Sequence, residues 1–593
     1  MAHKVIRPTI TIKARPFYQA VYDALIQNNT TPFVANILAR RIDDPDQAIA
    51  LSQLKLSSLS SPFLMKNMDK ASDRVIQAIE NGEVIGLETD HDCDGQTAHA
   101  ILYEALDKMF HHPLDKIRSY IGHRLKEGYG LSEILAHRIV NDSVKPTLVI
   151  TADNGSTDEP RIALLKSHGI DTIVTDHHTI PSEGTPKSAY AVLNPTQKDC
   201  DGDPYIAGCM VAWLLVAAVK TKMQKNQQLP KSDCQLTDLL DFVAVGTVAD
   251  CVSMAKSVNN RVVAYYGMQK ISQAKRFCWQ AFREHYQHGV DSEFLGFVIA
   301  PLLNSDGRMS DALSSVSFLL SNEFDQTRKW VNFLQQQNQQ RKAVQKEITE
   351  LAMARASQQY QAGQSSICVF LENGHAGVHG ISASRIKEAY GLPVILFSPK
   401  LDNNELITGS ARSIDGLNIK AILDKINRIS NTIVKYGGHP GAAGLSIHKK
   451  NLSHFSILFN QVTEDFIKRH SITTSPVIYS EGALKENELN LATLDKIAQL
   501  EPFGREFEAP IFCNKAEVLS LKMVGKHAEH AQILLKIGNK RLKSIWFFAE
   551  SFDEISQVSV ASIVNVAYKL SKEYFNGKTT LGLKIQYLSV ESQ

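Results

Sequence analysis

Three short segments of the chain concentrate carboxylate and imidazole side chains. They are Asp90-His91-Asp92-Cys93-Asp94, Asp153-Asn154-Gly155 and Asp176-His177-His178. Carboxylates that are crowded together repel one another unless a cation neutralises them, so such a cluster is most simply explained as a metal site. Oxygen ligands mixed with imidazole favour Mn²⁺ or Mg²⁺. The sequence therefore predicts a site for divalent cations, provided that the fold brings the three segments together.

Each segment taken alone has a simpler explanation. Asp90, Asp92 and Asp94 match the opening of a calcium-binding EF-hand loop, but Ile101 stands where that loop needs a bidentate Glu, and a strand precedes the segment where a helix is required. An isolated Asp-Asn-Gly or His-His is usually a polar turn or a helix cap. A fourth candidate, Asp250, ends an apolar stretch and by itself fits a helix end equally well.

The elements expected around these segments form a parallel sheet. Four short apolar runs, three of which precede the segments, are separated by stretches of helix length; the runs are Val84–Leu87, Thr147–Ile150, Thr172–Val174 and Ala191–Leu193. Strands that alternate with helices predict an α/β domain with a doubly wound parallel sheet. Since ligands bind at the carboxyl ends of such strands, the three segments are expected to meet in one crevice.

The rest of the chain predicts a long helix and two further domains. Residues 321–362 contain no Gly or Pro and are expected to form one connecting helix of about 40 residues, roughly 60 Å long. A second α/β domain follows, and then short alternating strands that predict a small β-barrel. The expected order is an N-terminal cap region, the parallel-sheet domain, the connecting helix, the second α/β domain and the barrel, at residues 1–82, 83–320, 321–362, 363–470 and 471–593.

The barrel contains a basic and aromatic stretch. Residues 536–548 include four basic side chains and three aromatic ones, Trp546, Phe547 and Phe548. This combination is typical of a groove that binds a single nucleic-acid strand and stacks its bases. An ordinary barrel strand with a solvated basic turn is the alternative, and it is slightly favoured for Trp546 and Phe548, which are then expected in the core.

Composition argues against a highly basic, a secreted, a membrane-spanning and a disulfide-bonded protein. The 593 residues, enough for three or four domains, carry 64 Lys and Arg against 62 Asp and Glu, so any basic surface must be local. The N-terminus lacks the apolar stretch of a signal peptide, and the longest apolar run, Cys209–Val219, is too short to span a bilayer. We therefore expect a cytoplasmic protein without membrane contact. The eight cysteines contain no Cys-x-x-Cys pair and are expected to be reduced.

The ordered motifs resemble a known family. The segments Asp90–Gly95, Thr151–Gly155, Asp176–His178 and Gly246–Asp250 resemble the four successive motifs of the DHH phosphoesterase superfamily. Further segments resemble its RecJ exonuclease branch, in the order found there: Arg124–Leu131, Pro301–Met309, Gly377–Arg385, Gly409–Ser413, Gly437–Gly444 and Leu500–Gly504. The resemblance extends from about Glu83 to Phe548.

The resemblance implies a DHH domain, a DHHA1 domain after the connecting helix, and an OB-like nucleic-acid-binding barrel. It implies a 5′→3′ exonuclease that acts on single-stranded DNA with a 5′ end, uses two divalent cations, Mn²⁺ or Mg²⁺, and releases 5′-mononucleotides in DNA recombination and repair. It also implies a single-stranded-DNA-binding protein and a helicase as candidate partners.

The resemblance also assigns residues. The ions would be held, with Asp153 bridging them, by Asp92, Asp94, Asp153, His177 and Asp250, and Glu88 is a further candidate ligand. Asp90 and His178 would orient ligands or contact phosphate, and His439 would face the scissile phosphate. The 5′ phosphate and the strand would be bound by Arg124, Ser410, Arg412, Gly438 and Arg308.

The chain departs from the family pattern at four positions. Glu88 stands where His is usual, which affects metal preference, and Ala411 stands where Gly is usual in the phosphate loop. Leu302 replaces a usual Arg and Asp306 a usual small residue, changes that would weaken contacts to DNA.

Two alternative functions follow from these features. The first is a phosphodiesterase for short oligoribonucleotides or cyclic dinucleotides, which would need neither the long helix nor the barrel. The second is a catalytically weakened DNA-binding member, against which the intact acidic motifs argue.

Overall fold

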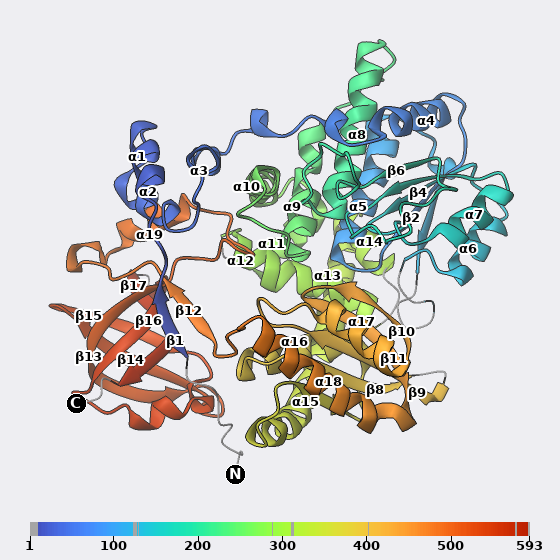
Figure 1. Ribbon diagram of the computed structural model, residues 1–593. Coiled ribbons are helices and arrows are strands. Elements are labelled where there is room, and N and C mark those ends of the chain that lie inside the picture. Colours follow the sequence, from blue (N-terminus) through green and yellow to red (C-terminus); the bar gives the residue numbers. More distant parts are fainter. Residues whose placement is uncertain are drawn as a thin grey trace. The chain divides into compact units, whose positions relative to one another are not determined.

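The computed structural model describes residues 10–122, 127, 130–286, 289–309, 313–400, 403–575 and 578–590. The chain forms two compact units (Figure 1). The parallel-sheet unit comprises residues 44–341 and 501–508, and the barrel unit comprises residues 1–43, 342–500 and 509–593. The N-terminal region 1–82 is thus shared between the units. A short segment after residue 500 belongs to the parallel-sheet unit.

Five parallel strands form the centre of the parallel-sheet unit, in the order β3-β2-β4-β5-β6. Their bounds are β2 (Ile85–Thr89), β3 (Ile117–Ile121), β4 (Leu148–Ala152), β5 (Asp171–Thr175) and β6 (Ala191–Leu193). Four of these strands coincide with the apolar runs of the sequence, which confirms the predicted parallel sheet. β3 was not among the predicted strands, because Arg118 and Ser119 interrupt its apolar residues.

Helices cover both faces of this sheet (Figure 1). On one face, α6 (Glu133–Val140) and α7 (Glu159–Ser167) pack through Leu135 and Ile162 in a core that includes Val149 of β4. On the other face, α5 (Cys93–Glu104), α8 (Gly208–Lys225) and α9 (Leu240–Ala249) pack on one another. The sheet is therefore doubly wound.

The remaining helices of this unit pack mainly on α5, α8 and α9. They are α3 (Pro45–Ser52), α4 (Met68–Glu80), α10 (Val258–Gln273), α11 (Phe277–His285), α12 (Ser292–Phe294), α13 (Ala300–Met309) and α14 (Leu313–Leu319). The predicted connecting helix is confirmed as α15 (Phe324–Gln361), which is 38 residues long. Among the helices of the described residues, none is both long enough and apolar enough to cross a membrane.

The barrel unit contains a second sheet, in the order β10-β11-β9-β8-β7. Its strands are β7 (Ile367–Phe370), β8 (Val394–Lys400), β9 (Asn403–Arg412), β10 (Ile433–His439) and β11 (Ala442–His448). α17 (Ile419–Ser430) and α18 (Leu452–Arg469) share one hydrophobic core with this sheet, which includes Phe397, Leu423 and Phe455. α16 (Ala376–Tyr390) and α15 contribute to a second core, with Leu396 of β8.

The predicted barrel is confirmed as a closed sheet in the order β13-β14-β15-β17-β16. Its strands are β13 (Phe512–Val524), β14 (His530–Ile537), β15 (Lys540–Trp546), β16 (Ile563–Phe575) and β17 (Lys578–Val590). The N-terminal strand β1 (Thr11–Ala14) pairs in parallel with β12 (Val477–Ser480). α1 (Gln19–Gln27), α2 (Pro32–Leu38) and α19 (Leu491–Ala498) complete the unit.

Candidate metal centre

The three acidic segments leave the sheet at the same level. Thr89 pairs with Ala152, and Ala152 pairs with Thr175, so the residue after each strand emerges beside its neighbour. Backbone bonds continue this alignment, since the Asp153 N–H donates to the Thr175 carbonyl at 2.9 Å. Along the chain, β2 is followed by β3, which lies on one side of β2 in the sheet, and then by β4, which lies on its other side. The segments therefore meet where the strand order reverses, which is where ligands bind in such sheets.

Two helix N-termini hold the carboxylates of the first segment. Asp92 caps α5 and accepts from the backbone N–H groups of Asp94 and Gly95 at 3.0 and 3.2 Å. Asp94 accepts from the backbone N–H groups of Gly208 and Cys209 at 2.7 and 2.9 Å, at the start of α8. Helix N-termini carry partial positive charge and stabilise nearby anions. The two carboxylates are therefore fixed in place before any cation binds.

Asp153 is turned into the centre by an unusual backbone conformation. Its φ is 63°, in the left-handed region that Asp and Asn tolerate better than most residues. Gly208 lies directly against it, and a Cβ at that glycine would be 2.7 Å from the Asp153 Cβ. The absence of a side chain at the start of α8 thus makes room for Asp153.

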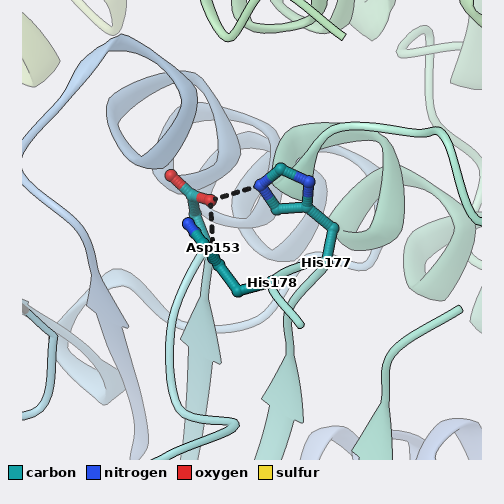
Figure 2. Close-up of side chains that lie close together, drawn as sticks. All are labelled: Asp153, His177 and His178. Carbon is teal, nitrogen blue, oxygen red and sulfur yellow. Dashed lines mark ion pairs between the residues drawn. The ribbon is translucent and has the colours of Figure 1, made fainter. Parts of the chain in front are cut away.

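Both histidines of the third segment lie near Asp153 (Figure 2), but their other partners differ. His177 Nε2 lies 3.1 Å from Asp153 Oδ1, 3.6 Å from Asp250 Oδ2 and 3.8 Å from Asp94 Oδ2. His178 Nδ1 donates to Asp176 Oδ1 at 2.8 Å and lies 3.9 Å from Asp153 Oδ1. His177 therefore faces the carboxylates of the centre, whereas His178 is held by the acid of its own segment.

Asp176 positions both histidines. Its Oδ1 accepts from the backbone N–H groups of His177 and His178, at 2.7 and 3.1 Å, as well as from the His178 ring, and its Oδ2 accepts from the Ser156 N–H at 3.0 Å. This carboxylate is buried and is occupied by hydrogen bonds. It therefore orients the imidazoles, a task that the motif alone did not assign to it.

Seven of the predicted residues come together in three groups of possible ligand atoms. Within each group, the atoms lie within 4.8 Å of one another; the groups are Asp153, His177, His178; Asp94, His177, Asp250; and Asp90, Asp92, Asp153. Asp153 and His177 each belong to two groups. His177 Nε2 is buried and makes no hydrogen bond within the described part of the chain. Oxygen and imidazole donors in this arrangement fit Mn²⁺ or Mg²⁺.

Crowding and burial raise the pKa of the acids. Burial, followed by the charge of Asp94, raises the pKa of Asp153 and of Asp250 well above the usual range of an aspartate. Burial and the charge of Asp90 also raise the pKa of Asp92. A divalent cation would supply the positive charge that stabilises these groups in their ionised form.

The pKa values of the two histidines shift in opposite directions. Burial and the nearby His178 lower the pKa of His177, which keeps its ring neutral and able to bind a cation. Burial alone would lower the pKa of His178, but the hydrogen bond to Asp176 and the charge of that acid raise it to about 9. In the metal-free protein, the protonated form of His178 is therefore favoured at neutral pH.

Glu88 is set apart from the three ligand groups. It is fully buried in β2, its Oε1 accepts from the Asn154 side chain at 3.3 Å, and it belongs to none of the three ligand groups of the described residues. Burial, followed by the charge of Asp158, raises its pKa well above the usual range. This location favours a neutral acid that supports Asn154 over a metal ligand.

α13 supports the first segment, which the sequence pattern did not predict. Asn304 Oδ1 accepts from the Cys93 N–H at 2.9 Å, and a Cβ at Gly307 would collide with the His91 carbonyl. The two departures in this region, Leu302 and Asp306, are buried in the same helix, where Asp306 accepts from the Ser315 N–H. The side chain of Arg308 lies outside the described residues, as does Arg124.

The predicted phosphate-binding residues of the second sheet lie on β9 and β10, which both pair with β11. Strand alternation places Ser410 and Arg412 on one face of β9, and Ser410 pairs with Gly444 of β11, which has no side chain to cover it. Gly438, with φ 144°, has no room for a Cβ. His439 is exposed and accepts from the Gly441 N–H at 3.2 Å. Ala411 is an ordinary strand residue in the core, so the departure there is accommodated.

The outer surface of the barrel carries both basic and aromatic side chains. Arg541, Lys543, Ile545 and Phe547 alternate outward along β15 and its end. Trp546 is buried as expected, but the expectation that Phe548 lies in the core is wrong, because it is 61% exposed. Its backbone turns into the left-handed region at φ 55° after the strand ends, which directs the ring outward.

Three family models match the chain: the DHH family N-terminal domain over residues 84–247, the DHHA1 domain over 363–465, and the RecJ OB domain over 480–587. The chain is 33% identical over 549 residues to the single-stranded-DNA-specific exonuclease RecJ of Haemophilus influenzae, covering 90% of this chain and 92% of that protein. It is 30% identical to RecJ of Dickeya dadantii over 541 residues, or 88% and 91% of the two chains.

The fold is also similar to solved structures. Crystal structures of RecJ from Thermus thermophilus in complex with Mn²⁺ and with Mg²⁺ match with TM-scores of 0.79 and 0.73, at 22% and 21% identity. Each match covers 99% of this chain, and 80% and 79% of the respective solved chains. At this level of identity the comparison supports the whole fold, including the order of its domains.

Proposed function

Because the chain belongs to the RecJ family of single-stranded-DNA-specific exonucleases, we propose that it hydrolyses single-stranded DNA from the 5′ end and releases 5′-mononucleotides, using two divalent cations, Mn²⁺ or Mg²⁺. The observation that carries the proposal is the meeting of Asp92, Asp94, Asp153, His177 and Asp250 in overlapping ligand groups. Because Asp153 belongs to two of these groups, it would contribute to the binding of both cations. Two cations, when bound, activate water and stabilise the attacking and leaving oxygens of a displacement at phosphorus.

The protein's own side chains orient the substrate around this centre. The His178 imidazolium, held by Asp176, is positioned to donate a hydrogen bond to a phosphate oxygen. Asp90 places its carboxylate next to Asp92 and Asp153 and helps to fix the ligand set. In the second sheet, Ser410 and Arg412 offer a hydroxyl and a guanidinium, which together suit a terminal phosphate because it carries more charge than an internal one.

The barrel supplies the affinity for the strand. Its outward Arg541 and Lys543 can follow the phosphates, and the exposed rings of Phe547 and Phe548 can stack bases. A role in recombination and repair, a cytoplasmic location, and a single-stranded-DNA-binding protein and a helicase as partners belong to the same proposal. These parts follow from the resemblance of the sequence motifs to the RecJ exonucleases.

The test is product analysis on single strands labelled at either end, with Mn²⁺ and with Mg²⁺. A 5′ label is expected to appear in a mononucleotide from the start, while a 3′ label passes through successively shorter strands. A series of shortened strands that keep the 5′ label would instead indicate degradation from the 3′ end. Hydrolysis of short oligoribonucleotides or cyclic dinucleotides alone would support the first alternative function, and binding without hydrolysis would support the weakened-enzyme alternative.

A further inference from the structure

A short segment that precedes the barrel in sequence is built into the parallel-sheet unit. Residues 501–508 belong to this unit although the residues on both sides belong to the other one. Ser292 Oγ donates to Glu501 Oε2 at 2.7 Å, and Arg261 Nη1 donates to the Pro502 carbonyl at 2.8 Å. The Arg261 guanidinium also lies over the Phe507 ring, 4.2 Å from its centroid, and both side chains are fully buried. The segment is thus anchored at both ends.

The middle of this segment packs on the loop that follows Asp250. Gly504 and Phe507 close a tight turn through two backbone hydrogen bonds of 3.1 Å. The Met254 N–H donates to the Arg505 carbonyl at 3.0 Å, and a Cβ at Gly504 would be 2.7 Å from Met254 Cγ. Glu506 accepts from Ser253 Oγ at 2.5 Å and pairs with Lys256 at 3.3 Å. These contacts fix the backbone of Arg505 against the loop that follows Asp250.

The Arg505 side chain is exposed at that position. It forms no ion pair or hydrogen bond within the described part of the chain, whereas its neighbour Glu506 is paired. Its charge nevertheless acts on Asp250 and counters the effect of burial and of Asp94 on the pKa of that carboxyl. Asp250 is 26% exposed, so this side of the centre is open to solvent. An unpaired guanidinium at an open, acid-lined metal centre is suited to bind an anion.

We propose that Arg505 contacts a phosphate of the DNA strand as it enters the metal centre, so that the anchored segment 501–508 contributes directly to substrate binding. This inference rests on the proposed function. Two other cations near the segment have partners of their own, since Lys256 pairs with Glu506 and Arg261 is buried under Phe507. Arg505 is therefore the side chain of this segment that is available for the substrate.

The test compares Arg505→Gln with Arg328→Gln, a change at an arginine of the same unit that is 53% exposed and pairs with Glu284. Arg505→Gln is expected to lower kcat/KM on single-stranded DNA about tenfold, as for the loss of one charge-assisted contact. Binding of a fluorescent single strand, measured in an Asp153→Asn background to prevent cleavage, should lose about 0.7 from the slope of log affinity against log salt. Arg505→Lys should retain that slope, and Arg328→Gln should match the parent.

Two results would overturn the inference. One is unchanged affinity and salt slope in Arg505→Gln while the parent is active. The other is a shift in the Mn²⁺ concentration for half-maximal activity with an unchanged salt slope, which would mean that Arg505 acts on the metal centre and not on DNA. An inactive parent would instead refute the proposed function. Unfolding temperatures of the variants should equal that of the parent, because the side chain is exposed.

Discussion

Asp153 combines two roles in a single residue, since it belongs to two ligand groups and adopts a left-handed backbone conformation. A change to Ala would remove the carboxylate and also strain the backbone, because Ala tolerates this conformation less well than Asp or Asn. Asp153→Asn is therefore the variant that tests the carboxylate without straining the backbone. It keeps the shape and the backbone preference but removes the charge that a bridging ligand needs.

We expect Asp153→Asn to lower exonuclease activity at saturating Mn²⁺ by on the order of 100-fold or more, with an unchanged circular dichroism spectrum. The matched control is Asp115→Asn, an exposed aspartate just before β3, at the opposite end of the sheet. Activity of Asp153→Asn within tenfold of the parent would contradict the assignment of Asp153 to the metal centre.

Glu88 provides a second test at the scale of one residue. Because burial and the charge of Asp158 raise the pKa of Glu88, its neutral form is favoured, and Gln reproduces that form. Glu88→Gln is therefore expected to keep activity within about threefold and to keep the ratio of Mn²⁺-supported to Mg²⁺-supported activity. A changed ratio, measured beside Asp92→Asn as the ligand control, would show that Glu88 binds a cation after all.

At the scale of elements, β9 and α16 together place the candidate end-binding group. A Cβ at Gly380 of α16 would collide with the Arg412 guanidinium, so the glycine allows the arginine to lie along the helix. Arg412→Gln should slow cleavage of 5′-phosphorylated strands by about 1.5–3 kcal/mol, the range of a charge-assisted bond. Cleavage of 5′-hydroxyl strands should change far less.

The two substrates are compared in one competition assay with the parent and with Arg469→Gln, a change at an exposed arginine that pairs with Asp465 on α18. If Arg412→Gln slowed both substrates equally, Arg412 would be a general clamp for the backbone and not a sensor of the 5′ end.

The end of β15 supports a prediction about strand binding. Phe547 and Phe548 are 48% and 61% exposed, and the His530 ring meets both edge to face, at 5.1 and 5.0 Å. Each base stacked on an aromatic ring contributes about 1–3 kcal/mol. Phe548→Ala should weaken binding of single-stranded DNA by about 1 kcal/mol or more, regardless of the 5′ group.

Binding is measured by fluorescence anisotropy, with Phe63→Ala as the control at another exposed ring. Equal affinities of Phe548→Ala and the parent would leave the exposed rings without a role in stacking. A loss confined to 5′-phosphorylated strands would also contradict this prediction.

At the scale of the whole molecule, metal binding should change the dependence of stability on pH. The pKa values of Asp153 and Asp250 are raised in the folded, metal-free protein, because burial and neighbouring acids disfavour their charge. Their contribution to stability is fully present below the unfolded pKa and is lost as the pH rises through the raised folded pKa. Cations bind the ionised form, so they restore stability mainly at high pH.

We therefore expect Mn²⁺ to raise the unfolding temperature more at pH 8 than at pH 5.5. At a concentration 100-fold above its dissociation constant, a bound ion stabilises the fold by about 2.7 kcal/mol. The measurement is thermal unfolding with Mn²⁺ or with EDTA at both pH values, and Asp153→Asn should reduce the difference. Equal stabilisation at both pH values would contradict the raised pKa values.

The sequence by itself determined the framework of the molecule. Strand ends carrying Asp90, Asp153 and Asp176 could be located because a buried parallel strand is a short apolar run and its successor is the residue at the ligand-binding edge. The long helix followed from a stretch without Gly or Pro, and the barrel from short alternating strands. These features are local patterns, so they can be recognised without knowing which distant residues will become neighbours.

Only the tertiary structure showed which distant residues contact and support the residues of the metal centre. Asp94 is held by backbone groups at Gly208 and Cys209, more than 100 positions away, and the first segment is supported by Asn304. Whether Glu88 joins a ligand group depends on packing, and whether Phe548 faces the core or the solvent depends on a single backbone angle. Residues 501–508 join the parallel-sheet unit through contacts with residues over 200 positions earlier in the chain, such as that of Arg261 with Pro502. Such contacts leave no periodic pattern in the sequence, because they depend on which surfaces meet when the chain folds.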